Sequence, residues 1–335
     1  MPYQPPFQLT STMLHLVAEI AMLIGEWKAS QQSQVPMLRR GNRIKTVQAS
    51  LAIEQNTLSL EQVTAVIDGK VVLGLPKEIQ EVKNAFAVYE KLSIWRSSSL
   101  HNFLEAHRLL MSGLADDAGQ LRHSGVGIYR EAALIHMAPP AGQLPRLMEQ
   151  LFNWVAQTDL HPLIRSCAFH YELEFIHPFS DGNGRMGRLW QTLILSEWQP
   201  LLAYLPVETV IQRRQTVYYQ RLSEADASSD CSSFVEFMLL AIRDSLSEGI
   251  AIQQPALPSI TQAETPVETL VETPLKTGQA ILILLSANPT LSLREVALQL
   301  GKSLSAVERA VTKLKAEGAL SFTGAKKAGR WVVRR

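Results

Sequence analysis

The chain has 335 residues, 46% of them hydrophobic and 19% charged, an ordinary soluble composition that is too long for one small domain and suits two or three. Its net charge of +1 excludes a molecule that is attracted as a whole to nucleic acid or acidic surfaces, so only local charge matters. Because no basic segment precedes an apolar run at the start, and no apolar stretch approaches the roughly 20 residues of a membrane span, we predict a cytoplasmic protein without a membrane partner.

The first part of the chain is predicted to be helical. Apolar residues recur at helical spacing over 10–28 and, more briefly, over 46–56. Ser59, followed three residues later by Gln62, has the form of a capping box that opens another helix. Further helices are expected over 79–92, 99–111 and 144–157.

Two short β-like stretches interrupt the helical pattern. Residues 125–130 and 133–138 are bounded by turn residues, and Pro139 and Pro140 end the second stretch. This pattern predicts a hairpin or an extended flap within a helical protein. Helices are then expected again over 162–174, 185–197, 216–222 and 233–247.

The last part of the chain differs in composition. Residues 251–276 contain four prolines and four threonines but no glycine or aromatic residue, which is typical of an extended linker. Residues 277–335 carry ten Lys and Arg against three Glu, a net charge of +7. The expected order of elements is typical of a winged helix-turn-helix: helices over 279–286, 293–300 and 305–317, then a β-ribbon over 320–322 and 331–333.

The stretch HPFSDGNGRMGR, residues 177–188, combines features of a phosphate site. Gly182 and Gly184 allow backbone N–H groups to approach an anion, with Asn183 between them, and the helix that begins near Arg185 adds its positive dipole end. Arg185 and Arg188 are three residues apart, so both are neighbours on one helical face and can hold phosphate oxygens.

The same stretch supplies a base and a metal ligand. Asp181 is a hard oxygen ligand that suits Mg²⁺ bridging phosphates. His177 precedes a proline, where a helix must end, and its near-neutral pKa suits the removal of a proton from a nucleophile. Phe179 is expected to anchor the loop in the core. An alternative is a Zn²⁺ or Fe²⁺ site formed by His170, Glu174 and His177, but His170 is better interpreted as a hydrogen-bonded core histidine.

Residues 177–188 match, without a departure, the HPFx(D/E)GN(G/K)RxxR signature of Fic-domain proteins, so the chain resembles that family over roughly residues 1–249. The resemblance implies a helical fold that transfers AMP from ATP to a hydroxyl side chain of a target protein. It also implies roles for the motif: His177 as base, Asp181 as ligand of Mg²⁺, Gly182, Asn183 and Gly184 as the anion nest, Arg185 as a phosphate clamp, and Arg188 as partner of the γ-phosphate.

Three further stretches carry the resemblance. Residues 127–138 resemble the flap that aligns the target by strand addition. Tyr218 and Tyr219 resemble the YYxAL element near the adenosine, although Arg221 replaces the alanine. Residues 50–54 resemble the inhibitory motif (S/T)xxxE(G/N), in which Glu54 would pair with Arg188 and exclude the γ-phosphate; Gln55 departs from the usual Gly or Asn.

We therefore expect a mainly α protein with a Fic-type core and a short β-hairpin flap. Its expected parts are an N-terminal helical region with the inhibitory helix (1–95), the catalytic core (96–250), a linker (251–276) and a winged helix-turn-helix (277–335). The expected function is autoinhibited adenylylation of Ser, Thr or Tyr in a target protein, the chain itself included. Two alternatives stay open, namely AMP removal that uses Glu54, and DNA binding through the C-terminal domain. The sequence leaves the oligomeric state open.

Overall fold

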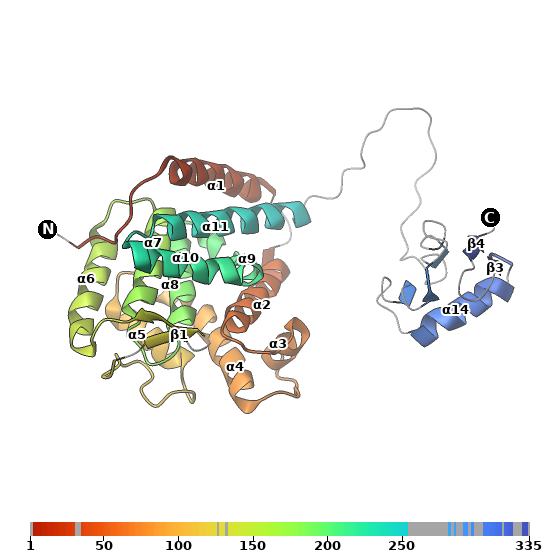
Figure 1. Cartoon of the computed structure of the whole chain (residues 1–335), viewed down its shortest axis with the longest axis horizontal. Helices are drawn as coiled ribbons and strands as arrows, with labels where there is room; N and C mark the ends of the chain where they lie inside the picture. Colours follow the sequence, from red (N-terminus) through yellow and green to blue (C-terminus); the bar gives the residue numbers. More distant parts are fainter. Residues whose placement is uncertain are drawn as a thin grey trace. The chain divides into compact units, whose positions relative to one another are not determined.

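A computed structural model describes residues 3–30, 35–125, 127–130, 133–253, 281–282, 285, 291–293, 296–297, 304–316, 318–323 and 330–333. The chain divides into two compact units, Met1–Pro258 and Ser259–Arg335, each described here by itself (Figure 1). Most of the linker predicted over 251–276 lies outside the described residues, and the boundaries of the four predicted parts stay predictions.

Among its described residues, the first unit has helices, one hairpin and short 3₁₀ turns as its regular structure. Its helices are α1 (Ser11–Ser30), α2 (Val35–Ile53), α3 (Leu60–Ile67), α4 (Pro76–Glu90), α5 (Leu100–Leu110), α6 (Leu144–Gln157), α7 (Pro162–Ile176), α8 (Asn183–Trp198), α9 (Val207–Arg213), α10 (Gln215–Ser228) and α11 (Ser232–Gln253). The 3₁₀ turns are η1 (Leu92–Ile94), η2 (Ala141–Gln143) and η3 (Pro200–Tyr204).

Most predicted helices of this unit are confirmed with ends close to those expected. The capping box is also confirmed, because the Ser59 hydroxyl accepts from the Gln62 amide at 3.3 Å and the Gln62 side chain accepts from the Ser59 amide at 2.9 Å. The prediction for α2 was wrong at its start, which lies eleven residues earlier, and α9 was not predicted. The first half of α2 contains a polar stretch with Gly41, which hides the apolar period.

Helices α7 and α8 pack together at the centre of the first unit, with α11 against α7 and α1 covering α11 (Figure 1). Buried residues occupy every face of α7 and α8, as expected for helices surrounded by protein. The loop between them carries Phe179, which is fully buried, 5.3 Å from the ring of Phe103 in an aromatic cluster with Phe152 and Trp190. The predicted anchoring of Phe179 is therefore confirmed, and the ends of both helices are held in place.

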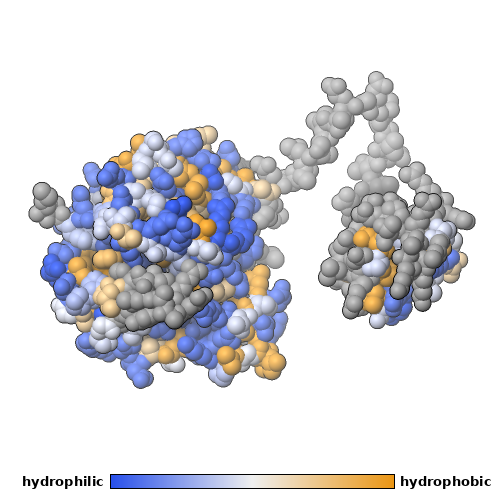
Figure 2. All heavy atoms as spheres, in the orientation of Figure 1, coloured by the Kyte–Doolittle hydropathy of each residue, from blue (hydrophilic) through white to orange (hydrophobic). Residues whose placement is uncertain are grey.

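The predicted hairpin is present as β1 (Gly127–Arg130) and β2 (Ala133–Met137), an antiparallel pair. Gly127 lies opposite Met137, and the register shifts between Ile128 and Tyr129. Figure 2 shows polar residues over most of the visible described surface of the first unit, with apolar residues scattered among them. Within the described ranges, every helix falls short of the length and apolar character that a membrane span requires.

The second unit contains α14 (Leu304–Ala316) and the antiparallel ribbon β3 (Leu320–Thr323) and β4 (Arg330–Val333), which confirms the predicted third helix and ribbon. The two helices predicted before them lie mostly outside the described residues, and the described residues within both are helical. The core of this unit includes Val307 and Val311 of α14 and Trp331 of β4. The Trp331 indole N–H donates to the Leu291 carbonyl at 2.9 Å, which ties the ribbon to the chain before α14.

Candidate active site

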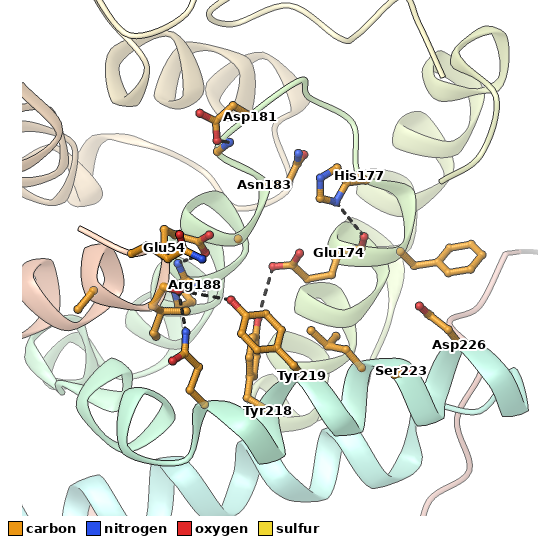
Figure 3. Close-up of a pocket in the computed structure, with 18 of the residues that line it drawn as sticks. Glu54, Glu174, His177, Asp181, Asn183, Arg188, Tyr218, Tyr219, Ser223 and Asp226 are labelled. Atoms are coloured by element: carbon orange, nitrogen blue, oxygen red, sulfur yellow. Dashed lines mark hydrogen bonds and ion pairs between the residues drawn. The ribbon is translucent and has the colours of Figure 1, made fainter. Parts of the chain in front are cut away.

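A cavity of about 620 Å³ lies in the first unit at the start of α8. Its walls are the C-terminal end of α2, the last turn of α7, the α7–α8 loop and one face of α10 (Figure 3). Predicted site residues from three parts of the sequence line it, namely Glu54, His177, Asp181, Gly182, Asn183, Gly184, Arg188, Tyr218 and Tyr219. The fold therefore brings together all but one of the residues that the sequence singled out.

His177 is the residue at which α7 ends. Its backbone is left-handed, with φ of 47°, and its amide donates to the Leu173 carbonyl at 2.9 Å. A left-handed conformation is uncommon for residues other than glycine, although histidine tolerates it better than most. Nδ1 of the imidazole lies 3.4 Å from the Glu174 carbonyl oxygen, and the ring faces the cavity (Figure 3). The turn thus aims the imidazole at the space in front of α8.

Arg122 holds this turn, although no sequence pattern had indicated it. The arginine is only 3% exposed, and its guanidinium donates to the carbonyls of His177 at 2.7 Å, Ile176 at 3.3 Å, Ser124 at 2.7 Å and Pro139 at 2.7 Å. Four carbonyls on one buried cation fix the His177 backbone against the base of the hairpin. Because the partners are up to 55 residues away in the chain, no local pattern could have indicated this role.

Side-chain contacts hold the loop between α7 and α8 in place. The Asn183 side chain bonds both the amide and the carbonyl of Phe179 at 2.9 Å, so its amide group fixes the loop. His107 stacks on Phe179, accepts from Gly119 and approaches the Asp181 carbonyl at 3.0 Å; burial lowers the pKa of His107 to about 4, so the ring is neutral. This support keeps the left-handed Gly182 (φ 86°) in place as N-cap of α8.

The first N–H groups of α8 therefore open into the cavity wall formed by Gly182, Asn183 and Gly184. Such groups have no partner within their own helix and carry the positive end of the helix dipole. Asp181, beside them, has a side chain that is 52% exposed. Its Oδ1 accepts from the Gly182 amide at 2.6 Å and from Arg185 at 2.9 Å.

Glu54 and Arg188 form an ion pair across this wall, with the Arg188 Nη2 2.7 Å from the Glu54 Oε1. Arg188 is 1% exposed and also donates from Nε to the Ser50 hydroxyl and from Nη2 to the Ser50 carbonyl, both at 3.0 Å. Burial by itself lowers the pKa of Arg188, but the Glu54 carboxylate outweighs it and raises the pKa. Its Nη1 is buried and has no hydrogen-bond partner among the described residues.

The Glu54 carboxylate occupies the space directly over Gly184. A Cβ atom added to Gly184 would lie 2.3 Å from the Glu54 Oε1, far inside van der Waals contact. Glycine is therefore required at this position while Glu54 is in place. The carboxylate consequently stands at the anion-attracting start of α8 as well as on Arg188.

The end of α2 places Glu54 through a left-handed turn. The Gln55 amide donates to Ala52 and the Asn56 amide to Leu51, both at 3.1 Å, and Gln55 has φ of 68°. This is a Schellman motif with Gln55 at the position that favours glycine or asparagine. The departure at Gln55 thus leaves the geometry intact, at a backbone cost of roughly 1 kcal/mol relative to glycine.

Helix α10 also holds the end of α2. The Gln215 Nε2 donates to the Ile53 carbonyl at 2.8 Å, and the Tyr219 hydroxyl donates to the same oxygen at 3.4 Å. This carbonyl belongs to the last helical residue, which has no acceptor role within α2. Gln215 and Tyr219 also line the cavity. Side chains that would surround a ligand therefore also hold Ile53, the residue before Glu54.

The remaining predicted residues have other surroundings. Arg185 does not line the cavity, and its side chain, which is 5% exposed, pairs instead with Asp181 at 2.9 Å and Glu81 at 3.5 Å. Tyr218 is 1% exposed, with its hydroxyl 3.0 Å from the His170 Nε2. The other His170 nitrogen lies 2.6 Å from Gln191, which confirms the interpretation of a hydrogen-bonded core histidine.

Several known proteins are similar to this chain. Residues 97–195 match the Fic/DOC family, and residues 275–320 match a winged helix-turn-helix DNA-binding family. The crystal structure of a Fic family protein from Desulfovibrio desulfuricans G20 is 47% identical, covers 99% of this chain and 98% of its own, and superposes with a TM-score of 0.73. A Fic-1 structure from C. elegans, 23% identical with a TM-score of 0.58, covers 71% of this chain and 73% of its own and shares the fold.

Curated relatives are named for an activity. Protein adenylyltransferase fic-1 of Caenorhabditis briggsae is 30% identical over 257 residues, 68% of this chain and 47% of the relative. Protein adenylyltransferase Fic of Nematostella vectensis is 29% identical over 207 residues, 56% of this chain and 44% of the relative. The chain thus spans about half the length of the curated relatives it matches.

Proposed function

This chain belongs to the Fic family, and from that premise we propose that its cavity transfers AMP from ATP to a hydroxyl side chain of a target protein, the chain itself included. The observation that carries the proposal is the unpartnered Nη1 of Arg188, a buried cationic donor in the wall of the cavity that His177 faces. A buried guanidinium donor without a partner costs free energy, and a phosphate oxygen would satisfy it. The names of the curated relatives support the same reaction.

The two ends of the α7–α8 loop have different roles in the proposed reaction. The N–H groups that begin α8 hold the phosphates, with Arg188 on the terminal one, and this fixes the α-phosphorus near His177. His177 takes the proton of the target hydroxyl, whose oxygen bonds to the α-phosphorus while the bond to the β-phosphate oxygen breaks. AMP remains on the target oxygen and pyrophosphate leaves. Backbone pairing with β1 or β2 would hold the target segment in line.

Asp181 suits a Mg²⁺ ion bound together with the nucleotide. Mg²⁺ commonly takes one or two carboxylates, phosphate oxygens and waters as ligands. The half-exposed Asp181 offers one carboxylate beside the first N–H groups of α8. The cation would neutralise phosphate charge as it develops. This neutralisation is important because the cavity lining carries more negative than positive charge. Its carboxylates belong to Glu54, Glu174, Asp181 and Asp226, whereas its arginine is Arg188.

We propose that Glu54 inhibits this reaction. Its carboxylate is bonded to the Arg188 Nη2 and stands over Gly184, so it occupies two of the places where a terminal phosphate would bind. A triphosphate can enter fully only if Glu54 leaves, and otherwise lies misaligned. Intact-mass analysis of the Glu54→Gly variant after incubation with ATP and Mg²⁺ tests the function. One added AMP supports transfer, and an unchanged mass of this variant and of every candidate target contradicts it.

The contact between Gln215 and Ile53 gives a prediction about this inhibition. We expect Gln215→Ala to raise the rate of AMP transfer about fivefold, because the end of α2 is then held by one hydrogen bond fewer and Glu54 leaves Arg188 more often. The rate of AMP incorporation, followed by mass spectrometry, measures the effect. Gln220→Ala is the matched control, since Gln220 lies on the same helix but bonds Glu224.

The gain must depend on Glu54. In a Glu54→Gly background, Gln215→Ala is expected to give no increase, because the inhibitory carboxylate is already absent. An equal gain in both backgrounds would show that Gln215 acts directly on the nucleotide. The opposite reaction, AMP removal, is tested in the same series, since release of AMP from a labelled protein would be abolished by Glu54→Gly.

DNA binding by the second unit is a second candidate function, favoured by its match to a winged helix-turn-helix DNA-binding family. On α14, Ser305, Arg309 and Lys313 are exposed and four residues apart, so they share one helical face. A basic helical face of this kind can contact phosphates and base edges in a major groove. The +7 charge of residues 277–335 adds a non-specific attraction.

We expect the double variant Arg309→Ala, Lys313→Ala to weaken binding of the full chain to duplex DNA about tenfold or more at moderate salt. The slope of log affinity against log salt should fall by about two, one for each cation that no longer neutralises a phosphate. Fluorescence anisotropy with a labelled duplex measures both. Arg213→Ala, which removes an exposed arginine from the first unit, should change neither, and an unchanged slope in the double variant would contradict the proposal.

A further inference from the structure

Glu174 is a carboxylate in the cavity wall for which the proposed reaction has no role. It lies on α7, one turn before His177, and its side chain is 13% exposed. Figure 3 shows its carboxylate pointing into the middle of the cavity, between Arg188 on one side and Asp226 on the other. A buried acceptor in such a position indicates a ligand group that donates hydrogen bonds.

The neighbours of Glu174 keep it charged but satisfy it only weakly. The Tyr218 hydroxyl lies 3.4 Å from its Oε1 and the His170 Nε2 lies 3.7 Å away, both long for hydrogen bonds. Burial alone would raise the pKa of Glu174, but His170 and the nearby charges of His177 and Arg188 outweigh it, so the pKa is lowered. The carboxylate therefore retains acceptor capacity toward the cavity.

The order of groups along the cavity indicates which part of a nucleotide meets Glu174. The phosphate wall, with Gly182, Gly184 and Arg188, lies at one end. Figure 3 shows Ser223 and Asp226, from later turns of α10, on the side of Glu174 that is away from Arg188. Leu222 of the same turns also lines the cavity, so this part of the lining is partly apolar and suits a base. A nucleoside triphosphate has its ribose between phosphates and base, and Glu174 lies between the two ends.

We propose that Glu174 accepts a hydrogen bond from a ribose hydroxyl and makes the site select ribonucleotides over deoxyribonucleotides. The inference rests on the proposed function, since it requires a nucleotide in this cavity. An acidic side chain that accepts from a ribose hydroxyl is a known way of recognising nucleotides. Removal of the hydroxyl leaves the charged acceptor buried and unpaired, which is why a site built in this way rejects the analogue.

The test compares ATP with 2′-deoxy-ATP and 3′-deoxy-ATP as AMP donors, in the Glu54→Gly background so that inhibition does not interfere. The measured quantity is the ratio of kcat/KM for ATP to that for each deoxy analogue. We expect a ratio of about ten or more for one analogue with Glu174, and a ratio near one with Glu174→Leu. Glu174→Gln, which keeps a neutral acceptor, should give an intermediate ratio.

The ratio separates recognition of the hydroxyl from a general effect on the site. A change in the field at His177 alters ATP and deoxy-ATP equally, so it leaves the ratio unchanged. Glu172→Gln is the matched control, because Glu172 lies two residues away on the same helix and bonds Tyr3 instead; its ratio should equal that of the parent.

Three outcomes would overturn the inference. Transfer with equal ratios for Glu174 and Glu174→Leu would refute ribose recognition while the transferase function stands. An unchanged ratio together with a higher Mg²⁺ requirement in Glu174→Leu would assign the carboxylate to a cation instead. The absence of transfer from all three nucleotides to every candidate target would contradict the proposed function itself, and the inference with it.

Discussion

Glu54→Gly is expected to raise the rate of AMP transfer by about tenfold to a hundredfold, the range of a typical coupling free energy between an inhibitory group and a ligand. The substitution removes one of the two hydrogen bonds of the Arg188 Nη2 and clears the space over Gly184 in one step. Both gains concern the terminal phosphate, so the variant should bind ATP in the position required for transfer. The rate of AMP incorporation, followed by intact mass, measures the effect.

A second measurement separates release of inhibition from a change in the fold. Arg188 stays buried after the substitution and loses its anionic partner, so the free energy of unfolding should fall in the absence of nucleotide. Added ATP should then stabilise the variant more than the wild type, because a phosphate replaces the missing carboxylate. Glu54→Gln, which keeps the size but not the charge, should give an intermediate rate. Equal rates for wild type and Glu54→Gly would refute autoinhibition.

Local patterns in the sequence predicted the parts of the site that are local in the structure. The α7–α8 loop depends on a helix end before Pro178, two glycines and a helix start, all within residues 177–188. Such features are decided by backbone conformations of neighbouring residues, which sequence patterns report directly. The turn that carries Glu54 belongs to this class too, although Gln55 shows that a left-handed position can hold a residue other than glycine.

The supports of the site could not be predicted, because they join distant segments. Arg122 reaches His177 across 55 residues, His107 reaches Asp181 across 74, and Gln215 reaches Ile53 across 162. Each is a polar side chain in a sequence context typical of an ordinary helix or loop. The sequence also could not predict which way each arginine side chain points. Arg185 and Arg188 are three residues apart on α8, and yet only Arg188 lines the cavity.

Because of these supports, we expect His177 to contribute strongly to the rate of the proposed reaction. Its backbone is held by Arg122 in a left-handed turn, so the imidazole is placed in advance and no reorganisation is needed when a hydroxyl arrives. Removal of a positioned general base commonly costs about 10²–10⁴-fold in rate. We therefore expect His177→Ala to reduce AMP transfer by about that factor, including in the Glu54→Gly background, where the uninhibited rate makes the loss measurable.

The control for this prediction is His177→Asn. Asparagine tolerates a left-handed backbone, so this variant should keep the turn and the thermal stability of the parent, whereas alanine adds backbone strain at φ of 47°. Neither side chain can accept the proton, so both variants should be equally inactive in an intact-mass assay, although only the alanine variant should be less stable. Transfer by His177→Asn within about tenfold of the parent would mean that His177 positions the loop and that another group takes the proton.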